Sequence, residues 1–140
     1  MRTNTVPVDI FCSGTLRDED VLPAIADLLR PLRLTREHRA LVREVDRIDW
    51  EQEDDGISDL SDELWGALDD YLPPYTYAGS SEGDGALFGV WAEVDCDIPK
   101  YPAGESPNGS GDCYEVTDHG NVSCGYRRKN GTWVEYWSVV

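Results

Sequence analysis

The chain is short of positive charge, and one long stretch has none. Only 12 of its 140 residues are lysine or arginine, against 28 aspartates and glutamates, which leaves a formal net charge of −16. The 52 residues from Ile48 to Pro99 contain no lysine or arginine. Because DNA, RNA and anionic membranes are themselves polyanions, this charge argues against binding any of them directly and favours a basic partner.

Long apolar runs are also missing. No stretch approaches the roughly 18 apolar residues that a membrane span needs, and the residues after Met1 do not form the apolar run of a signal peptide. We therefore expect a cytoplasmic protein. The four cysteines show no CxxC spacing. Given the length of the chain and the missing signal peptide, we expect free thiols and not a disulfide framework.

The sequence has little that could hold a metal ion or a cofactor. It has only two histidines, His38 and His119, and they are far apart and accompanied by no cysteine pair, which argues against a zinc site. Asp84, Asp95 and Asp97 lack the spacing of a calcium-binding loop. We expect neither a metal nor a cofactor.

What the chain does contain is enough to fold. A length of 140 residues is usual for one domain, and a hydrophobic content of 40% with five tryptophans and seven tyrosines is not the composition of a disordered chain. We predict a single domain over residues 1–140. Apolar periodicity and capping residues predict a short strand and then three helices. These are a strand over Val8–Cys12, a helix from Asp18 to the residue before Pro31, a helix capped by Thr35, and a helix capped by Ser58 or Ser61 that ends before Pro73.

The second half is predicted to be a sheet. Tyr75–Ala78 and Ala86–Val94 are candidate strands, and residues 99–111 are expected to form a loop. Two turns, residues 118–121 and 129–132, divide the tail into three strands of a meander. The predicted fold class is therefore α+β, with an N-terminal short strand and three helices packed on a C-terminal antiparallel sheet.

The register of the meander follows from the assumed turns. If each turn has two central residues, Asp118 faces Asn121 and Lys129 faces Thr132. This register places Cys113 and Cys124 on the same face of the first hairpin, diagonal to each other, and lets Arg128 stack on the cross-strand Trp133.

The charges are segregated along the chain. Six of the twelve basic residues are arginines between residues 30 and 47, and Arg36, Arg39, Arg43 and Arg47 recur at a spacing that places them on one helical face. The acids follow directly, and carboxylates three or four residues apart on a helix lie about 5–6 Å apart, near the phosphate step of a nucleic-acid strand. The predicted partner-binding residues are Glu51, Glu53, Asp54, Asp55, Asp59, Asp62, Glu63, Asp69 and Asp70.

Three interpretations of this acidic stretch compete. It can be a solvated surface of an interaction module, a consequence of a high-salt proteome, or a mimic of DNA that binds the basic surface of a nucleic-acid-binding protein. A fourth use of the charges is self-association, in which the arginines dock on the acidic stretch of the same chain or of a second copy in a homodimer.

Catalytic chemistry is weakly represented. Cys12 to Arg17 follows a strand and precedes a helix, a context that suits a phosphate-binding loop with a cysteine nucleophile. The tyrosine-phosphatase pattern has five residues between cysteine and arginine, whereas this chain has four. His119 lies in a tight turn, where histidines are usually solvated. We assign no catalytic residue.

Two resemblances accompany these patterns. Residues Gly14 to Val21 are similar to the loop after the first strand of the gamma-glutamylcyclotransferase-like family, although Ser13 stands in the place of that family's tyrosine, and this resemblance implies a small enzyme. The C-terminal half resembles small acidic proteins of phages and mobile elements. The residues that carry this resemblance are Pro73–Tyr75, Gly79, Glu82–Ala86, Phe88–Trp91, Asp118–Val122 and Trp137–Val140.

The second resemblance implies a mobile-element origin and no particular activity. Together with the charge pattern it leads to one hypothesis of function. The protein is expected to act in the host cytoplasm as an inhibitor of a nucleic-acid-binding defence complex, of the anti-CRISPR or anti-restriction type.

Overall fold

The computed structural model describes residues 4–52 and 56–140, and these form two compact units. The helical unit consists of the described residues up to Leu72 together with Tyr77–Trp91. The C-terminal unit consists of Pro73–Thr76 and Ala92–Val140. The chain passes from one unit to the other at three points, so more than one segment connects the two units. The prediction of a single domain over residues 1–140 stays a prediction.

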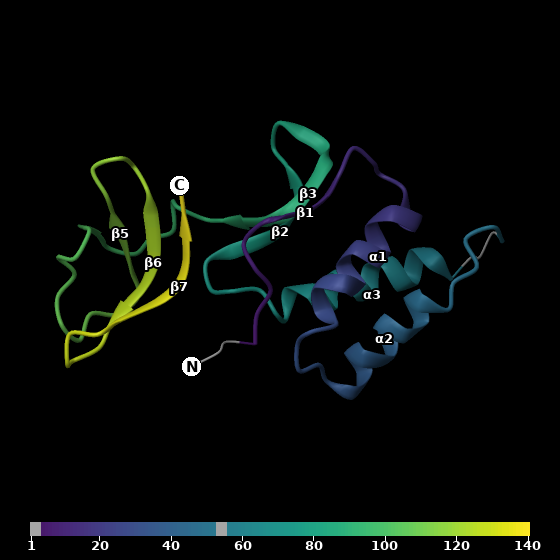
Figure 1. Ribbon diagram of the computed structural model, residues 1–140, viewed down its shortest axis with the longest axis horizontal. Helices are drawn as coiled ribbons and strands as arrows, with labels where there is room; N and C mark the ends of the chain where they lie inside the picture. Colours follow the sequence, from purple (N-terminus) through teal and green to yellow (C-terminus); the bar gives the residue numbers. More distant parts are fainter. Residues whose placement is uncertain (1–3, 53–55) are drawn as a thin grey trace. The chain divides into compact units, whose positions relative to one another are not determined.

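The helical unit contains three helices and a small sheet (Figure 1). The sheet has the strand order β1-β3-β2, and β1 pairs antiparallel with β3. The elements are β1 (Ile10–Ser13), α1 (Asp18–Leu29), α2 (Arg36–Asp46), α3 (Ile57–Asp69), β2 (Thr76–Ser81) and β3 (Asp84–Ala92).

Local signals explain where the first two helices begin. Three acids occupy the first turn of α1, where the helix dipole favours negative charge. The hydroxyl of Thr35 accepts a hydrogen bond of 3.2 Å from the backbone N–H of His38, so Thr35 is the predicted N-cap of α2. The third helix differs from the prediction, because α3 begins at Ile57 and neither Ser58 nor Ser61 caps it. Its N-cap is Gly56.

Apolar side chains of the three helices meet in one core. Leu22 and Leu29 of α1 and Leu64 and Leu68 of α3 are completely buried in it. The aromatic ring of Trp65 lies between two rings of the sheet and joins the helices to it, with ring centroids 6.0 Å from Phe11 and 5.8 Å from Phe88. Burial of such side chains contributes about 1.5–3 kcal/mol each to stability.

The C-terminal unit is a four-stranded sheet with the order β4-β5-β6-β7. The last three strands form the predicted antiparallel meander, and the α+β class is confirmed. A fourth strand, which the sequence did not predict, lies in the expected loop and pairs parallel with β5, so the sheet is mixed. The strands are β4 (Lys100–Pro102), β5 (Cys113–Val116), β6 (Val122–Arg127) and β7 (Trp133–Val139).

The predicted register of the first hairpin is wrong by one residue. Thr117, and not Asp118, pairs with Asn121, since the backbone N–H of Thr117 donates to the Asn121 carbonyl at 3.0 Å. The turn therefore has three central residues and ends on Gly120, whose φ of 84° is the left-handed conformation that such turns require. Cys113 now faces Gly125 across the strands, while Cys124 faces Tyr114.

The register shift places Cys113 and Cys124 on opposite faces of the sheet, contrary to the prediction. All four cysteines are free thiols. The second turn also has three central residues, because the Arg128 N–H donates to the Thr132 carbonyl at 2.8 Å. As a result, Arg127 and not Arg128 lies over Trp133, with its guanidinium carbon 5.5 Å from the ring centroid.

A bulge at Cys124/Gly125 absorbs this shift between β6 and β7. A Cβ atom at Gly125 would lie 2.0 Å from the Val134 carbonyl oxygen and 3.0 Å from the Glu135 Cα, so the strands would have to move apart. We expect Gly125→Ala to lower the free energy of unfolding by about 1–3 kcal/mol. Urea denaturation checks this, with Gly111→Ala as control, because Gly111 has open space at that position. Equal stabilities of the two variants would contradict the close approach of β7 to Gly125 at the bulge.

The hairpin of β2 and β3 is longer than predicted. Strands β2 and β3 extend further into the glycine-rich segment than predicted and leave only Glu82 and Gly83 between them. None of the helices in residues 4–52 and 56–140 is long and apolar enough to cross a membrane. The predicted packing of helices on the C-terminal meander involves two different units and stays a prediction.

Candidate partner-binding surface

Helix α3 gathers acidic residues on one face. Its apolar residues Leu60, Leu64, Ala67 and Leu68 recur at helical spacing and are buried, which turns the opposite side outward. We call the outward residues of this helix and its C-cap the acidic face. All of its members are exposed, and they are Asp59, Asp62, Glu63, Asp69 and Asp70.

One histidine lies next to the acidic face. The Nε2 atom of His38 is 3.4 Å from a carboxylate oxygen of Asp70, which is 66% exposed. The other ring nitrogen of His38 is 2.9 Å from the Tyr71 hydroxyl, and that hydroxyl accepts a hydrogen bond of 3.1 Å from the Thr35 N–H. Since the hydroxyl proton is then free to point at His38 Nδ1, the arrangement suits the neutral tautomer that carries its proton on Nε2.

The remaining carboxylates of the acidic face are free of such contacts. Within the part of the chain that the structure describes, Asp59, Asp62, Glu63 and Asp69 form no ion pair. Their charges are therefore directed to solvent or to a partner.

The other predicted partner-binding residues precede α3. Glu51 is exposed, and its backbone N–H donates a hydrogen bond of 3.1 Å to a carboxylate oxygen of Asp49. Glu53, Asp54 and Asp55 lie outside the described residues. The structure thus brings five of the nine predicted residues together on one helix and its C-cap, and leaves Glu51 apart from them on the preceding segment.

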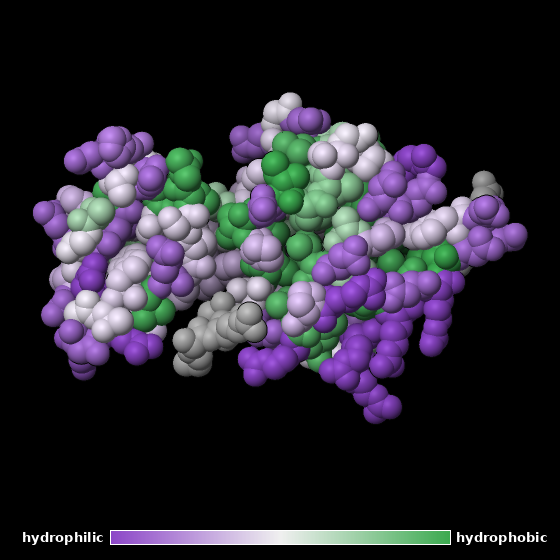
Figure 2. Space-filling view, viewed as in Figure 1, coloured by the Kyte–Doolittle hydropathy of each residue, from purple (hydrophilic) through white to green (hydrophobic). Residues whose placement is uncertain are grey.

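The predicted basic face of α2 is present as well. We call Arg36, Arg39, Arg43 and Arg47 the arginine face; all four are exposed, and Figure 2 shows hydrophilic residues gathered over this helix. By contrast, the exposed Arg30 is paired within the unit, where its guanidinium donates two hydrogen bonds of 2.5 and 2.7 Å to Asp46. In the described ranges, no residue of the arginine face forms an ion pair.

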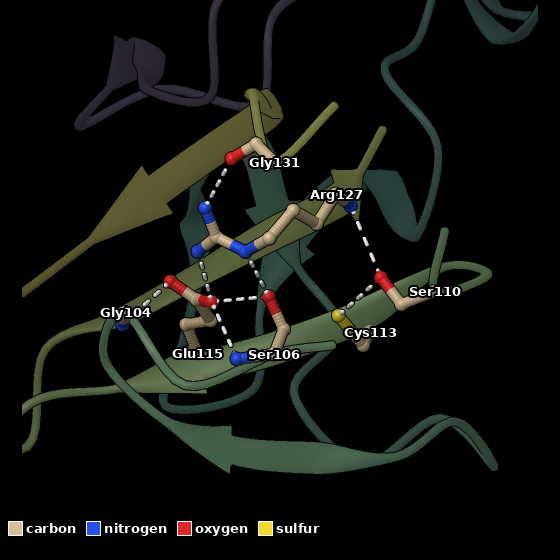
Figure 3. Close-up of polar contacts among 7 residues, drawn as sticks. All are labelled: Gly104, Ser106, Ser110, Cys113, Glu115, Arg127 and Gly131. Atoms are coloured by element: carbon tan, nitrogen blue, oxygen red, sulfur yellow. Dashed lines mark hydrogen bonds and ion pairs between the residues drawn. The ribbon is translucent and has the colours of Figure 1, made fainter. Parts of the chain in front are cut away.

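A polar cluster that the sequence did not reveal lies in the C-terminal unit (Figure 3). Glu115, on β5, is only 8% exposed and accepts hydrogen bonds from the backbone N–H groups of Gly104 and Ser106 at 3.0 and 3.2 Å. The Ser106 hydroxyl donates to it as well. Arg127, on β6, donates to Glu115 at 2.7 Å, to the Ser106 hydroxyl at 2.9 Å and to the Gly131 carbonyl at 2.9 Å.

These contacts determine the protonation state of Glu115. Burial alone raises the pKa of a carboxyl group, but here the hydrogen bonds from Ser106, Gly104 and Arg127 outweigh it and lower the pKa to about 2. Every strong donor around the carboxylate is used inside the unit. No buried side-chain nitrogen or oxygen in the described residues lacks a hydrogen-bond partner. The cluster therefore holds the loop before β5 against the meander. Its hydrogen-bond donors are used within the unit and are not directed at a ligand.

A second carboxylate organises the aromatic residues of the same unit. Asp112 accepts hydrogen bonds from the hydroxyls of Tyr75 and Tyr136 at 2.6 and 2.7 Å. The contact with Asp112 and partial burial raise the pKa of Tyr75 to about 12. Tyr136 also packs against Tyr126, with ring centroids 5.8 Å apart. The tyrosines fill the space around one another and act as packing groups.

The candidate catalytic residues lack supporting geometry. The pKa of the Cys12 thiol is raised by burial and by Asp20, whereas a cysteine nucleophile needs a lowered pKa. Arg17 pairs with Glu19, and His119 is exposed in its turn. Among residues 4–52 and 56–140, no three His, Cys, Asp or Glu side chains gather in a way that could hold a metal ion.

Comparisons with protein-family models, with curated proteins and with solved structures give no match. The interpretation of the surface therefore depends on the residues themselves.

Proposed function

We propose that this protein binds the basic surface of a nucleic-acid-binding protein or complex and occupies the place of the phosphates. The observation that supports the proposal is the acidic face, with its exposed carboxylates along one side of α3. In the biological setting that we propose, the protein comes from a phage or mobile element and inhibits a defence complex such as a CRISPR effector or a restriction enzyme.

The spacing of the charges supports a phosphate mimic. From Asp59 to Asp70 the chain advances eleven residues, which is about 17 Å at 1.5 Å per residue. One strand of duplex DNA carries about five phosphates over that length, at 3.4 Å each. The acidic face has five carboxylates over the same length. A surface that binds a nucleic-acid backbone can thus meet the same number of charges on a rigid helix.

The repulsion between the carboxylates also favours a basic partner. Like charges placed side by side repel one another and reduce stability, and in the described residues the only basic side chain that contacts this face is the imidazole of His38. A basic partner would remove the repulsion and gain charge-assisted contacts. A general interaction module with a solvated acidic surface is the alternative, and it predicts that the acids of α3 contribute no more to binding than acids elsewhere.

Capture from a host lysate tests the proposal. We expect immobilised wild-type protein to retain a nucleic-acid-binding protein that duplex DNA or RNA then elutes, because both compete for one basic surface. A variant with all five acids of the acidic face changed to Asn or Gln should retain little of it. The matched control changes five exposed acids elsewhere to the corresponding amides, which are Glu82, Asp95, Asp97, Asp118 and Glu135.

The control variant has the same net charge as the neutralised one and should capture the partner like the wild type. The proposed function is wrong if the wild type retains no protein that nucleic acid can elute. It is also wrong if the two variants capture the partner equally well.

A further inference from the structure

The arginine face and the acidic face belong to the same unit but do not neutralise each other within the described chain. Helices α2 and α3 pack through their apolar sides, with Val42 and Val45 of α2 buried in the shared core. Their charged sides point to solvent. In the described residues, the one contact between a basic and an acidic side chain of these two segments joins His38 to Asp70.

The two faces match in length and in charge. The arginine face extends from Arg36 to Arg47 and the acidic face from Asp59 to Asp70, which is eleven residues, or about 17 Å, in each case. Four guanidinium groups and five carboxylates thus extend over the same distance. Arginine is the residue best suited to such contacts, since its planar fork binds carboxylates in a bidentate way, as Arg30 binds Asp46 within the fold.

We propose that the arginine face of one copy docks on the acidic face of a second copy, and that the reciprocal contact forms at the same time. Because each copy carries both faces on one unit, a two-fold axis uses each face once in each chain and closes the assembly as a dimer. A nucleic acid is the other anion that could fit the arginines, but the net charge of −16 repels it. This inference does not rest on the proposed function, but it uses the same acidic face, so binding of the proposed partner there would separate the dimer.

The salt dependence of such a dimer has a maximum. Two chains of charge −16 repel each other, and this repulsion acts across the whole of both molecules. At about 0.1 M salt the screening length is about 10 Å, so most of the repulsion is screened while contacts at hydrogen-bond distance persist. At about 0.01 M the repulsion extends to about 30 Å, and at about 1 M even the contacts weaken. We expect dimerisation to be strongest near 0.1 M.

Charge reversal of each face separately provides the test. The first variant carries Arg39→Glu and Arg43→Glu, and the second carries Asp62→Arg and Asp69→Arg. All four positions are exposed, so both variants should give the circular dichroism spectrum of the wild type. The control variant carries Arg128→Glu and Lys129→Glu, which are exposed in the C-terminal unit.

Sedimentation velocity of the purified proteins near 0.1 M salt should show a dimer for the wild type and the control variant. Each face variant alone should be a monomer, because its reversed face loses the charge that attracts the opposite face: the four positions of the arginine face then carry no net charge, and the five positions of the acidic face carry only one net negative charge. An equimolar mixture of the two face variants should dimerise again, since the reversed α2 of one meets the reversed α3 of the other. Monomeric wild type at all salt concentrations, a face variant that dimerises like the wild type, or a monomeric mixture would each overturn the proposal. Duplex DNA that binds the wild type but not the first variant would also overturn it.

Discussion

Replacing Arg127 with methionine is expected to lower the free energy of unfolding of the C-terminal unit by about 3–5 kcal/mol. The side chains of Glu115 and Arg127 are only 9% and 14% exposed, so the substitution leaves a carboxylate buried without its cation. It also removes the hydrogen bonds that Arg127 donates to Ser106 and to the Gly131 carbonyl. Methionine keeps much of the volume of the side chain, so loss of packing is a minor part of the effect.

Arg128→Met is the matched control for this prediction. Arg128 is the next residue on the same hairpin, it is exposed, and it makes backbone hydrogen bonds that the substitution leaves intact. Its replacement should change stability by less than about 0.5 kcal/mol. Hydrogen exchange of the β5 and β6 amides reports on the C-terminal unit directly. Equal protection of these amides in the two variants would show that the buried pair does not hold the sheet together.

The same pair makes stability depend on pH in a defined range. The pKa of Glu115 is about 2 in the folded protein against 4.5 for an ordinary glutamate. A lowered folded pKa stabilises the protein above the unfolded pKa, and this contribution is lost as the pH falls from about 4.5 through about 2. Glu115→Gln should lack this loss, which is on the order of 3 kcal/mol. Parallel slopes for wild type and variant across this range would contradict the assignment.

Much of the helical part could be predicted from the sequence. The cap at Thr35 and the apolar spacing of α3 are local signals, and a helical period places the acids opposite the leucines without knowledge of the rest of the fold. The start of α3 was misplaced because serines near a helix start are good caps, but here Gly56 occupies the cap position. Such boundaries depend on a few tenths of a kcal/mol.

The sheet was predicted less well because register depends on the number of residues in a turn. A glycine after two polar residues is compatible with a two-residue turn and with a three-residue turn, and each choice sends every side chain of the strand to a different face. The error at Gly120 therefore displaced Cys113 and hid the proximity of Glu115 to Arg127. Strand β4 could not be predicted because its three residues lie among prolines and glycines and have no local strand pattern, and only the parallel pairing with β5 across the intervening loop makes them a strand.

Changing the five carboxylates of the acidic face to amides should weaken binding to the proposed partner about 100-fold. Each exposed charge pair contributes about 0.2–1 kcal/mol, so five pairs contribute about 3 kcal/mol together, and each 1.4 kcal/mol corresponds to a factor of ten. Most of the affinity of the wild type should disappear when the salt is raised from about 0.1 to 1 M, because the screening length then falls from about 10 to 3 Å. Isothermal titration of the captured partner at several salt concentrations measures both effects.

Displacement of nucleic acid tests the mimic most directly. The captured partner is mixed with a fluorescent duplex or single strand that it binds, and the anisotropy is followed as this protein is added. The wild type and the variant with Glu82, Asp95, Asp97, Asp118 and Glu135 changed to amides should release the labelled strand at the same concentrations. The variant that lacks the carboxylates of the acidic face should need about 100-fold more. If it releases the strand as readily as the wild type does, or if the wild type binds the partner while the strand stays bound, the acidic face does not take the place of phosphates.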